Sequence, residues 1–202
     1  MKSSGYKDWA SFEQVGSDTF RYDTRVYLDP IGAPSQQDVC IGAVVGKNPG
    51  SARPLYASKS GLQPIDLGGD KLIPNVRSIV RKAYVLAAKT PPANAYIQIL
   101  NLFYLCNPDL EMAIKRIKIH STAKVCPSET NIFPWIWYVW GSHSDDLSLF
   151  KGRFATLMSN THFFVNTASG LVVHSRATED SSARHTQGLS HDLIVPALRR
   201  IV

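Results

Sequence analysis

The chain has 202 residues, of which 44% are hydrophobic and 19% are charged. This balance is typical of a single globular domain that buries roughly 70% of its unfolded surface, and it argues against intrinsic disorder. The 22 Lys and Arg residues outnumber the 16 Asp and Glu residues and give a net charge of +6, which suits a polyanionic partner.

The sequence predicts no contact with a membrane. Its longest apolar run, at 132–140, is interrupted by Pro134 and is far shorter than the roughly 20 residues that cross a bilayer. The first residues, MKSSGYKDWASFEQ, lack the apolar core of a secretory signal. We therefore expect a cytoplasmic protein.

Cysteine usage gives no sign of a metal or a disulfide framework. The chain has three cysteines, Cys40, Cys106 and Cys126, without a CxxC motif and without spacing to histidine that suits zinc. We expect reduced thiols, with no metal and no other cofactor.

From residue 39 onward, apolar runs alternate with amphipathic stretches of helical length. Strands are expected at Val39–Val45, Ala95–Leu100, Trp135–Trp140 and Phe163–Asn166. Helices are expected at Pro74–Ala88, Asp109–Ile119, Asp145–Met158 and about Ser190–Arg200. This order predicts an α/β fold, a three-layer α/β/α sandwich with a short, mostly parallel central sheet.

Two segments lie outside this alternation. Residues 1–36 are interpreted as an N-terminal extension that packs on one domain at 37–202, and Phe20–Leu28 reads as an added edge strand. Residues 51–71 are rich in Gly, Pro and Ser and are interpreted as a functional or mobile loop, because structureless connections of this length are uncommon in compact domains.

Polar motifs follow the predicted strands, at the edge of the sheet where open α/β folds bind their ligands. In chain order they are GKNPGS at 46–51, Asn101, WGSH at 140–143 and ARHTQGLS at 183–190. The first three also have structural interpretations: a Pro-Gly turn, a solvent-facing amide, and a glycine that permits a strand-to-helix turn. The sequence contains no phosphate-binding P-loop, no GxSxG elbow and no HExxH motif.

The last motif has two interpretations of equal weight. Ser190 can cap the final helix, which would leave His185 as a surface histidine. A leucine at position 189, on a polar loop beside Arg184 and His185, instead suits an apolar wedge that enters stacked bases.

Together the four motifs resemble those of the uracil-DNA glycosylase superfamily, in chain order over residues 37–202. VCIGAVVGKNPGSA is similar to the first signature of the mismatch-specific branch, and IQILNLF to the strand whose terminal Asn binds the flipped base. WYVWGSH is similar to the Trp-Gly-x-His segment, and ARHTQGLSH to the loop that intercalates into the duplex. A similar ordering occurs in a related bacterial and phage family.

The resemblance implies a DNA glycosylase, a hydrolase that flips out a pyrimidine and cleaves its N-glycosidic bond. Asn48 would position the attacking water, and His185 would donate to the carbonyl oxygen of the departing base. Asn101 would read the base edge. The implied base pocket also comprises Gly46, Lys47, Pro49, Gly50, Ser51 and His143. Leu189 would fill the gap that the extruded nucleotide leaves in the duplex. The other implied DNA contacts are Arg53, Arg176, Arg184, Gln187, Gly188 and Ser190. Arg199 and Lys47 are further basic candidates.

One departure bears on the substrate. Uracil-specific enzymes carry a tyrosine where this chain has Gly50, and that tyrosine blocks groups at C5 of the pyrimidine. We therefore expect a uracil-like or C5-modified pyrimidine, for example a hypermodified cytosine of phage DNA in anti-phage defence. A monofunctional, monomeric enzyme acting on double- or single-stranded DNA is expected, although Lys47 could support a Schiff base. The alternatives are a catalytically silent DNA-binding module and an N-glycosidase of free nucleosides or nucleotides.

Overall fold

The computed structural model describes residues 5–56, 60–120, 125–142 and 145–202. The strands of its main sheet are β1 (Tyr6–Val15), β2 (Asp18–Ile31), β3 (Val39–Gly46), β4 (Arg53–Pro54), β5 (Gln63–Asp66), β6 (Ala95–Asn101), β8 (Ile136–Tyr138), β10 (His162–Val165) and β11 (Val172–Val173). The α-helices in this part of the chain are α1 (Leu72–Leu86), α2 (Leu110–Ile117), α3 (Asp145–Lys151) and α4 (His191–Arg199). Two short strands, β7 (Ile132–Phe133) and β9 (Met158–Ser159), pair separately, and 3₁₀ turns lie at Pro127–Thr130 and Gly152–Thr156.

The helices and strands predicted from apolar periodicity between residues 39 and 200 are confirmed, with boundaries shifted by a few residues. Two of the helices begin at side-chain caps. The carboxylate of Asp109 accepts the Met112 amide at the start of α2, and the Ser190 hydroxyl accepts the Asp192 amide at the start of α4. The predicted helix at Asp145–Met158 is shorter, because α3 passes into a 3₁₀ turn after Lys151.

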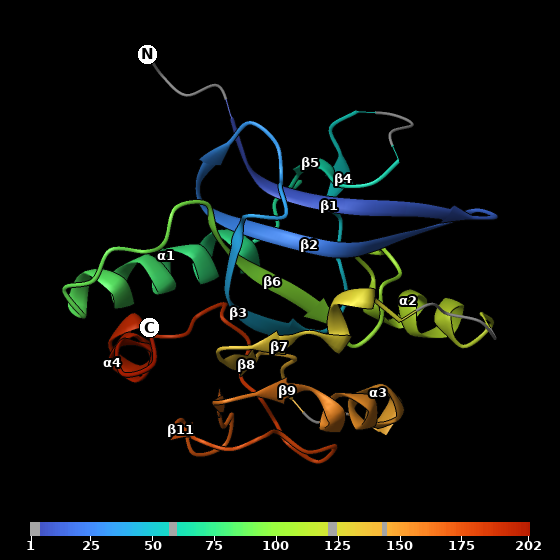
Figure 1. Cartoon of the computed structure of the whole chain (residues 1–202). Helices are drawn as coiled ribbons and strands as arrows, with labels where there is room; N and C mark the ends of the chain where they lie inside the picture. The colour runs from blue at the N-terminus through green and yellow to red at the C-terminus, as the bar shows by residue number, and fades with distance from the viewer. Residues whose placement is uncertain (1–4, 57–59, 121–124, 143–144) are drawn as a thin grey trace.

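The sheet is mostly antiparallel, so the expectation of a short, mostly parallel sheet was wrong. Its order is β11-β10-β8-β3-β6-β2-β1-β5-β4 (Figure 1). The four strands predicted from the sequence, β6, β3, β8 and β10, are neighbours and run parallel. All remaining neighbours in the sheet pair antiparallel. The error arose because, of these antiparallel strands, only Phe20–Leu28 in β2 was expected from the sequence.

Helices cover both faces of the sheet, with α1 and α4 on one face and α2 and α3 on the other (Figure 1). Alternate residues of β3 point to opposite faces, as the pleat requires. Val44 packs in the cluster that contains α1 and α4, whereas Ala43 and Val45 pack in the cluster that contains α2 and α3. The sheet is therefore buried between two hydrophobic cores.

The N-terminal residues form part of the sheet itself. β2 lies between β6 and β1, with Thr24 opposite Ile99 and Tyr27 opposite Tyr96. The expectation that Phe20–Leu28 adds an edge strand was therefore wrong, since β1 and β5 continue the sheet beyond it. This placement brings the β1–β2 hairpin to the edge at which β3 and β6 end.

The segment at 51–71 is not a structureless loop. Within it, β4 and β5 pair antiparallel, and β5 also pairs with β1, where Pro64 lies opposite Trp9. Residues 57–59 lie outside the described chain. Near the end of this segment, the Asp70 carboxylate accepts the amides of Leu72 and Ile73 at the start of α1.

We expect the stability of the fold to decrease as the pH falls from 7 to 5, in part through His162. Its ring nitrogens contact Tyr138 Oη at 2.9 Å and Arg176 Nη2 at 3.2 Å, and burial with the nearby Arg176 charge lowers its pKa to about 4. The unfolded chain takes up this proton near pH 6.5, so the contribution to stability is complete above that pH and is lost between about 6.5 and 4.

The measurement is the melting temperature as a function of pH for the wild type and for His162→Gln. The variant should show a smaller decrease on acidification, whereas substitution of the exposed His174 by Gln should leave the wild-type slope. Equal slopes for the wild type and His162→Gln would contradict the assignment.

Candidate functional site

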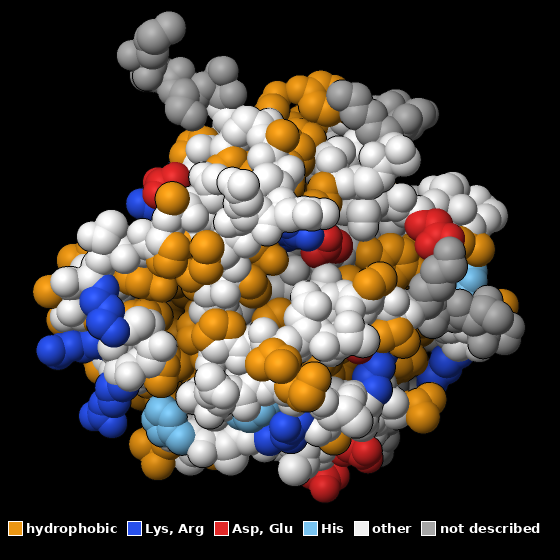
Figure 2. Space-filling model, viewed as in Figure 1, with side chains coloured by type: hydrophobic (Ala, Val, Ile, Leu, Met, Phe, Trp, Pro, Cys, Tyr) orange, Lys and Arg blue, Asp and Glu red, His pale blue; other side chains and the backbone are white. Residues whose placement is uncertain are grey.

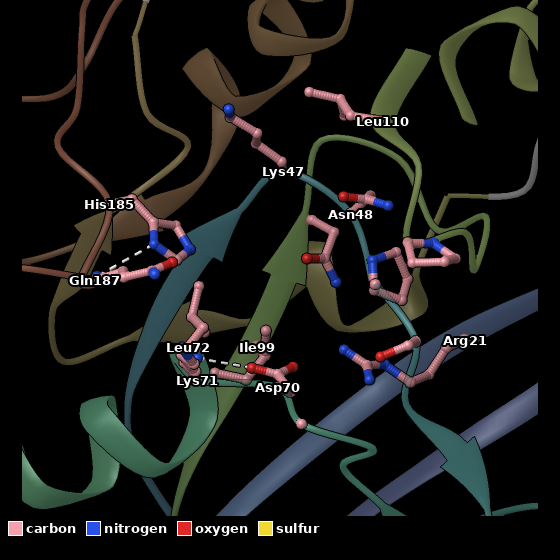
Figure 3. A pocket seen from close by; sticks show the side chains of 16 residues that line it. Arg21, Lys47, Asn48, Asp70, Lys71, Leu72, Ile99, Leu110, His185 and Gln187 are labelled. Carbon is pink, nitrogen blue, oxygen red and sulfur yellow. Dashed lines mark hydrogen bonds between the residues drawn. The ribbon is translucent and has the colours of Figure 1, made fainter. Parts of the chain in front are cut away.

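A cavity of about 700 Å³ opens where β3 and β6 end. These strands pair in parallel register up to Gly46 opposite Asn101, so the residues that follow them meet at one edge of the sheet. The cavity is lined by Arg21, Lys47, Asn48, Pro49, Gly50, Ser51, Gly69, Asp70, Lys71, Leu72, Ile99, Asn101, Pro108, Leu110, His185 and Gln187. Figure 3 shows His185 and Gln187 on one side of it and Asn48 on the other.

Asn101, the last residue of β6, lines the cavity with a buried side-chain amide. The residue is 2% exposed, and its buried Nδ2 has no hydrogen-bond partner among the described residues. A Cβ atom on Gly46 would lie 3.2 Å from Asn101 Oδ1, so this glycine leaves room for the amide. A buried donor without a partner costs about 1–3 kcal/mol, and a ligand that accepts from Nδ2 would recover that energy.

Asn48 is held in one orientation by the backbone that precedes α2. Its Nδ2 donates to the carbonyl oxygen of Asn107 at 2.8 Å. The amide nitrogen is thereby occupied, and Oδ1 is left as the acceptor that this side chain can offer at the cavity wall. An acceptor in this position can orient a water molecule.

His185 lies on a loop that is fixed to two elements of the fold. Ala183 exchanges backbone hydrogen bonds with Gly141, and the Arg184 amide donates to the carbonyl of Val165 at the end of β10. On the other side, the Asn75 side chain of α1 donates to the Thr186 carbonyl at 2.7 Å. The loop therefore holds His185 against the ends of the parallel strands.

The contacts of His185 define its protonation state. The backbone amide of Gln187 donates to Nδ1 at 3.2 Å, so Nδ1 is the acceptor and the proton lies on Nε2 (Figure 3). Burial and the positive charge of Lys47 lower the pKa of His185 below its ordinary value of 6.5, while Asp70 opposes the shift. At neutral pH, His185 is a neutral imidazole that offers an Nε2–H donor.

The Lys47 side chain extends past Gly141, which lies shortly after the end of β8. A Cβ atom on Gly141 would lie 2.9 Å from Lys47 Cε, so a glycine at this position leaves room for the lysine side chain. Burial lowers the pKa of the Lys47 ammonium group. Lys47 lines the cavity, and its charge acts on His185. Its part in a base pocket stays a prediction.

Gly50 and Ser51 separate this cavity from a second one of about 710 Å³. Both residues line both cavities, and Gly50 adopts a φ of 64° with no atom within 4 Å of the position that a Cβ would occupy. The second cavity is bounded by β1 and β2 residues, including Phe12 and Thr19, and by Arg53. Space therefore continues past Gly50, away from Asn101.

Three charged residues of the cavity were not predicted from the sequence, namely Arg21, Asp70 and Lys71. Arg21 is 2% exposed, but in the sequence it falls on the same phase of β2 as Asp23 and Arg25, so the alternation gives no sign that it is buried. Asp70 stands immediately before an amphipathic stretch, which is a helix-cap signal, but neither pattern reveals that the residue borders the cavity.

The remaining predicted pocket residues are placed as follows. Pro49 lines the cavity, whereas Gly46 is buried behind it and accepts the Leu102 amide through its carbonyl. His143 lies outside the described residues. The structure thus brings together Asn48, Asn101 and His185, and their chemical roles stay predictions.

The predicted DNA contacts are dispersed. Gln187 is exposed and lines the cavity, and Arg53 lines the second cavity. The Arg176 guanidinium is used inside the protein, where it contacts the Phe154 and Ala155 carbonyls and His162. On the face shown in Figure 2, Lys and Arg side chains gather beside α1 and α4 and otherwise lie singly.

The remaining predicted DNA contacts lie in the loop before α4 and in α4 itself. Arg184 Nη2 lies 3.4 Å from the Gly188 carbonyl, which it contacts as a donor, and Gly188 has a φ of 71°, a value that favours glycine. Ser190 caps α4, and Arg199 is exposed in the last turn of that helix.

Leu189 is a core residue, so its prediction as an exposed wedge was wrong. It is 6% exposed and packs in the same hydrophobic cluster as Ile194. Leu189 precedes the cap residue Ser190, and Ile194 follows that cap by four positions, which is the pattern of a hydrophobic staple. The leucine thus fixes the entry of the chain into α4.

The described chain offers neither a metal site nor a membrane span to extend this picture. Within it, no group of three or more His, Cys, Asp and Glu side chains could hold a metal ion. None of its helices has the length and apolar character to cross a bilayer. Comparison with models of protein families, with curated proteins and with solved structures gives no match for this chain.

Proposed function

We propose that the protein is a DNA glycosylase that binds an extruded pyrimidine in the 700 Å³ cavity and hydrolyses its N-glycosidic bond. The observation that carries the proposal is the convergence of Asn48, Asn101 and His185, from three separate segments, on this cavity. Each contributes a defined atom: an acceptor oxygen, a buried unpartnered N–H, and an imidazole N–H. The parallel arrangement of β6, β3, β8 and β10, with helices on both faces of the sheet, supports the comparison with the uracil-DNA glycosylase superfamily.

These three atoms match the charge changes of glycosidic hydrolysis. As the bond between C1′ and the base nitrogen breaks, the sugar gains positive character and the base leaves with its electron pair as an anion. The Nε2–H of His185 donates to the carbonyl oxygen on which this charge collects, and preorganised donors of this kind supply the main stabilisation. Asn101 Nδ2 holds an acceptor on the base edge.

Water completes the reaction. Asn48 Oδ1 accepts a hydrogen bond from the water whose oxygen bonds to C1′, and the proton released from that water passes through solvent to the departed base anion. The products are the free base and an abasic sugar. Extrusion of the base costs a few kcal/mol, which contacts between the protein and the DNA must offset.

The proposal is tested by mass analysis of bases released from duplex and single-stranded DNA that carries uracil, a thymine mismatch or a C5-modified cytosine. We expect release of a C5-modified pyrimidine by the wild type, loss of release in Asn48→Ala, and full release in Asn160→Ala, which alters an exposed asparagine outside the cavity. DNA that is bound but never cleaved would favour a silent binding module. Cleavage of free nucleotides that is independent of DNA would favour a nucleotide N-glycosidase, and a borohydride-trapped adduct would show a Schiff base.

A single substitution at Gly50 tests the expected tolerance of C5 substituents. Because space continues past Gly50, Gly50→Tyr should reduce release of a C5-modified base more than release of uracil. The φ of 64° adds about 1–2 kcal/mol of strain, so Gly50→Ala serves as the control for backbone strain alone. An equal loss of both activities in the tyrosine variant, or exclusive release of uracil by the wild type, would reject the C5 preference.

A further inference from the structure

A buried arginine at the cavity wall has no role in the reaction described above. Arg21 is 2% exposed, lines the cavity, and extends toward it from β2 in Figure 3. Its Nε and Nη1 atoms are buried and have no hydrogen-bond partner among the described residues. Buried guanidinium nitrogens without partners are costly, and burial correspondingly lowers the pKa of Arg21.

The acidic groups whose charges act on Arg21 are already engaged or neutral. Asp8 is paired with Arg77, and Asp70 Oδ1 accepts the amides at the start of α1. Burial raises the pKa of the Cys106 thiol to about 11, so this thiol remains uncharged at neutral pH. These carboxylates therefore act on the Arg21 charge from a distance, and neither of them pairs with its Nε or Nη1.

Cationic side chains predominate among the charged residues that line the cavity, which also favours an anionic ligand. Three of its lining side chains, Arg21, Lys47 and Lys71, are cationic, and Asp70 is the carboxylate among the residues that line it. The DNA backbone lies at the surface of a complex, whereas the Arg21 guanidinium is almost fully buried. The group that reaches it must enter the cavity together with the rest of the ligand.

We infer that Arg21 forms an oxyanion site at the inner end of the cavity and binds a carboxylate or phosphate oxygen of the ligand. Two adjacent N–H groups of a guanidinium match two oxygens of such a group, which a lysine cannot reproduce. The inference goes beyond the proposed function, since it specifies the charge of the ligand whether or not a glycosidic bond is cleaved. The oxyanion is carried either by an acidic C5 substituent of the base or by the phosphate of a nucleotide.

Binding of matched small ligands distinguishes these two sources. Titration calorimetry compares 5-carboxy-2′-deoxycytidine with 5-methyl-2′-deoxycytidine, and deoxyuridine monophosphate with deoxyuridine, for the wild type. The anionic member of at least one pair should bind more than tenfold tighter. The carboxyl pair identifies the base substituent as the source, and the phosphate pair identifies the nucleotide phosphate. No gain in either pair would overturn the inference, whatever the outcome of the base-release assay.

Variants separate an anion site from a structural arginine. The gain should disappear in Arg21→Met, decrease in Arg21→Lys and persist in Arg200→Gln, which removes an exposed cation that follows α4. Without ligand, Arg21→Met should melt no lower than the wild type, because it removes an unpartnered buried charge. A marked fall in its melting temperature, or an anion preference that survives in this variant, would assign Arg21 to the fold instead.

Discussion

Replacing His185 by alanine is expected to slow base release by about 10²–10³, or roughly 3–4 kcal/mol of transition-state stabilisation. The imidazole is neutral, its Nδ1 is occupied by the Gln187 amide, and its Nε2–H is left for the departing base. Removal of this donor affects the anion that forms in the transition state more than the bound substrate. Single-turnover rates on the substrate that the base-release assay identifies should therefore fall, with DNA affinity nearly unchanged.

Two further results make this prediction specific. His174→Ala, which changes an exposed histidine, should retain the wild-type rate. Because burial and Lys47 lower the pKa of His185, its neutral form persists below about pH 6.5, and the single-turnover rate should be flat from pH 8 to about that value. A rate that halves near pH 6.5, or an equal loss in both alanine variants, would contradict the role of His185.

Gly42→Ala is expected to lower the free energy of unfolding by about 3 kcal/mol, or the melting temperature by roughly 6–12 °C. Gly42 lies in β3, and a Cβ there would overlap the indole ring of Trp135, which is 1% exposed and cannot move into solvent. The overlap displaces β3, the strand that leads into Asn48 and the neighbouring cavity residues.

The control for this prediction is Gly32→Ala. A Cβ on Gly32 would meet no atom within 4 Å, so its effect should stay within about 0.5 kcal/mol. Thermal unfolding of both variants provides the comparison. Equal melting temperatures would show that Trp135 does not confine β3, and loss of base release in Gly42→Ala would then need another cause.

The central parallel strands and the helices could be predicted because their signals are local. Apolar residues of α1 recur at helical spacing, β3 is a continuous apolar run, and β6 is apolar apart from Gln98 and its last residue, Asn101. The antiparallel part could not be predicted in the same way. β4 and β11 have two residues each, too few for a period, and the place of the β1–β2 hairpin depends on pairing with the distant β6.

The candidate site was predictable to the same extent. Asn48 follows β3 and Asn101 ends β6, and the carboxyl ends of such parallel strands meet at one edge. Arg21 reaches the cavity only through the antiparallel pairing of β2, which leaves no mark near the motifs themselves. Leu189 was misinterpreted because a polar neighbourhood in sequence suggested exposure, whereas the staple with Ile194 buries it.

The most direct test of the account is a crystal structure of the protein with DNA that carries the substrate nucleotide as its 2′-fluoro analogue. Fluorine opposes positive character on the sugar, so the glycosidic bond stays intact and the bound state can be observed. The account predicts an extruded base in the cavity within hydrogen-bond distance of Asn101 Nδ2 and His185 Nε2, with a water on Asn48 Oδ1. A base that remains stacked in the duplex, or that binds away from these three side chains, would contradict it.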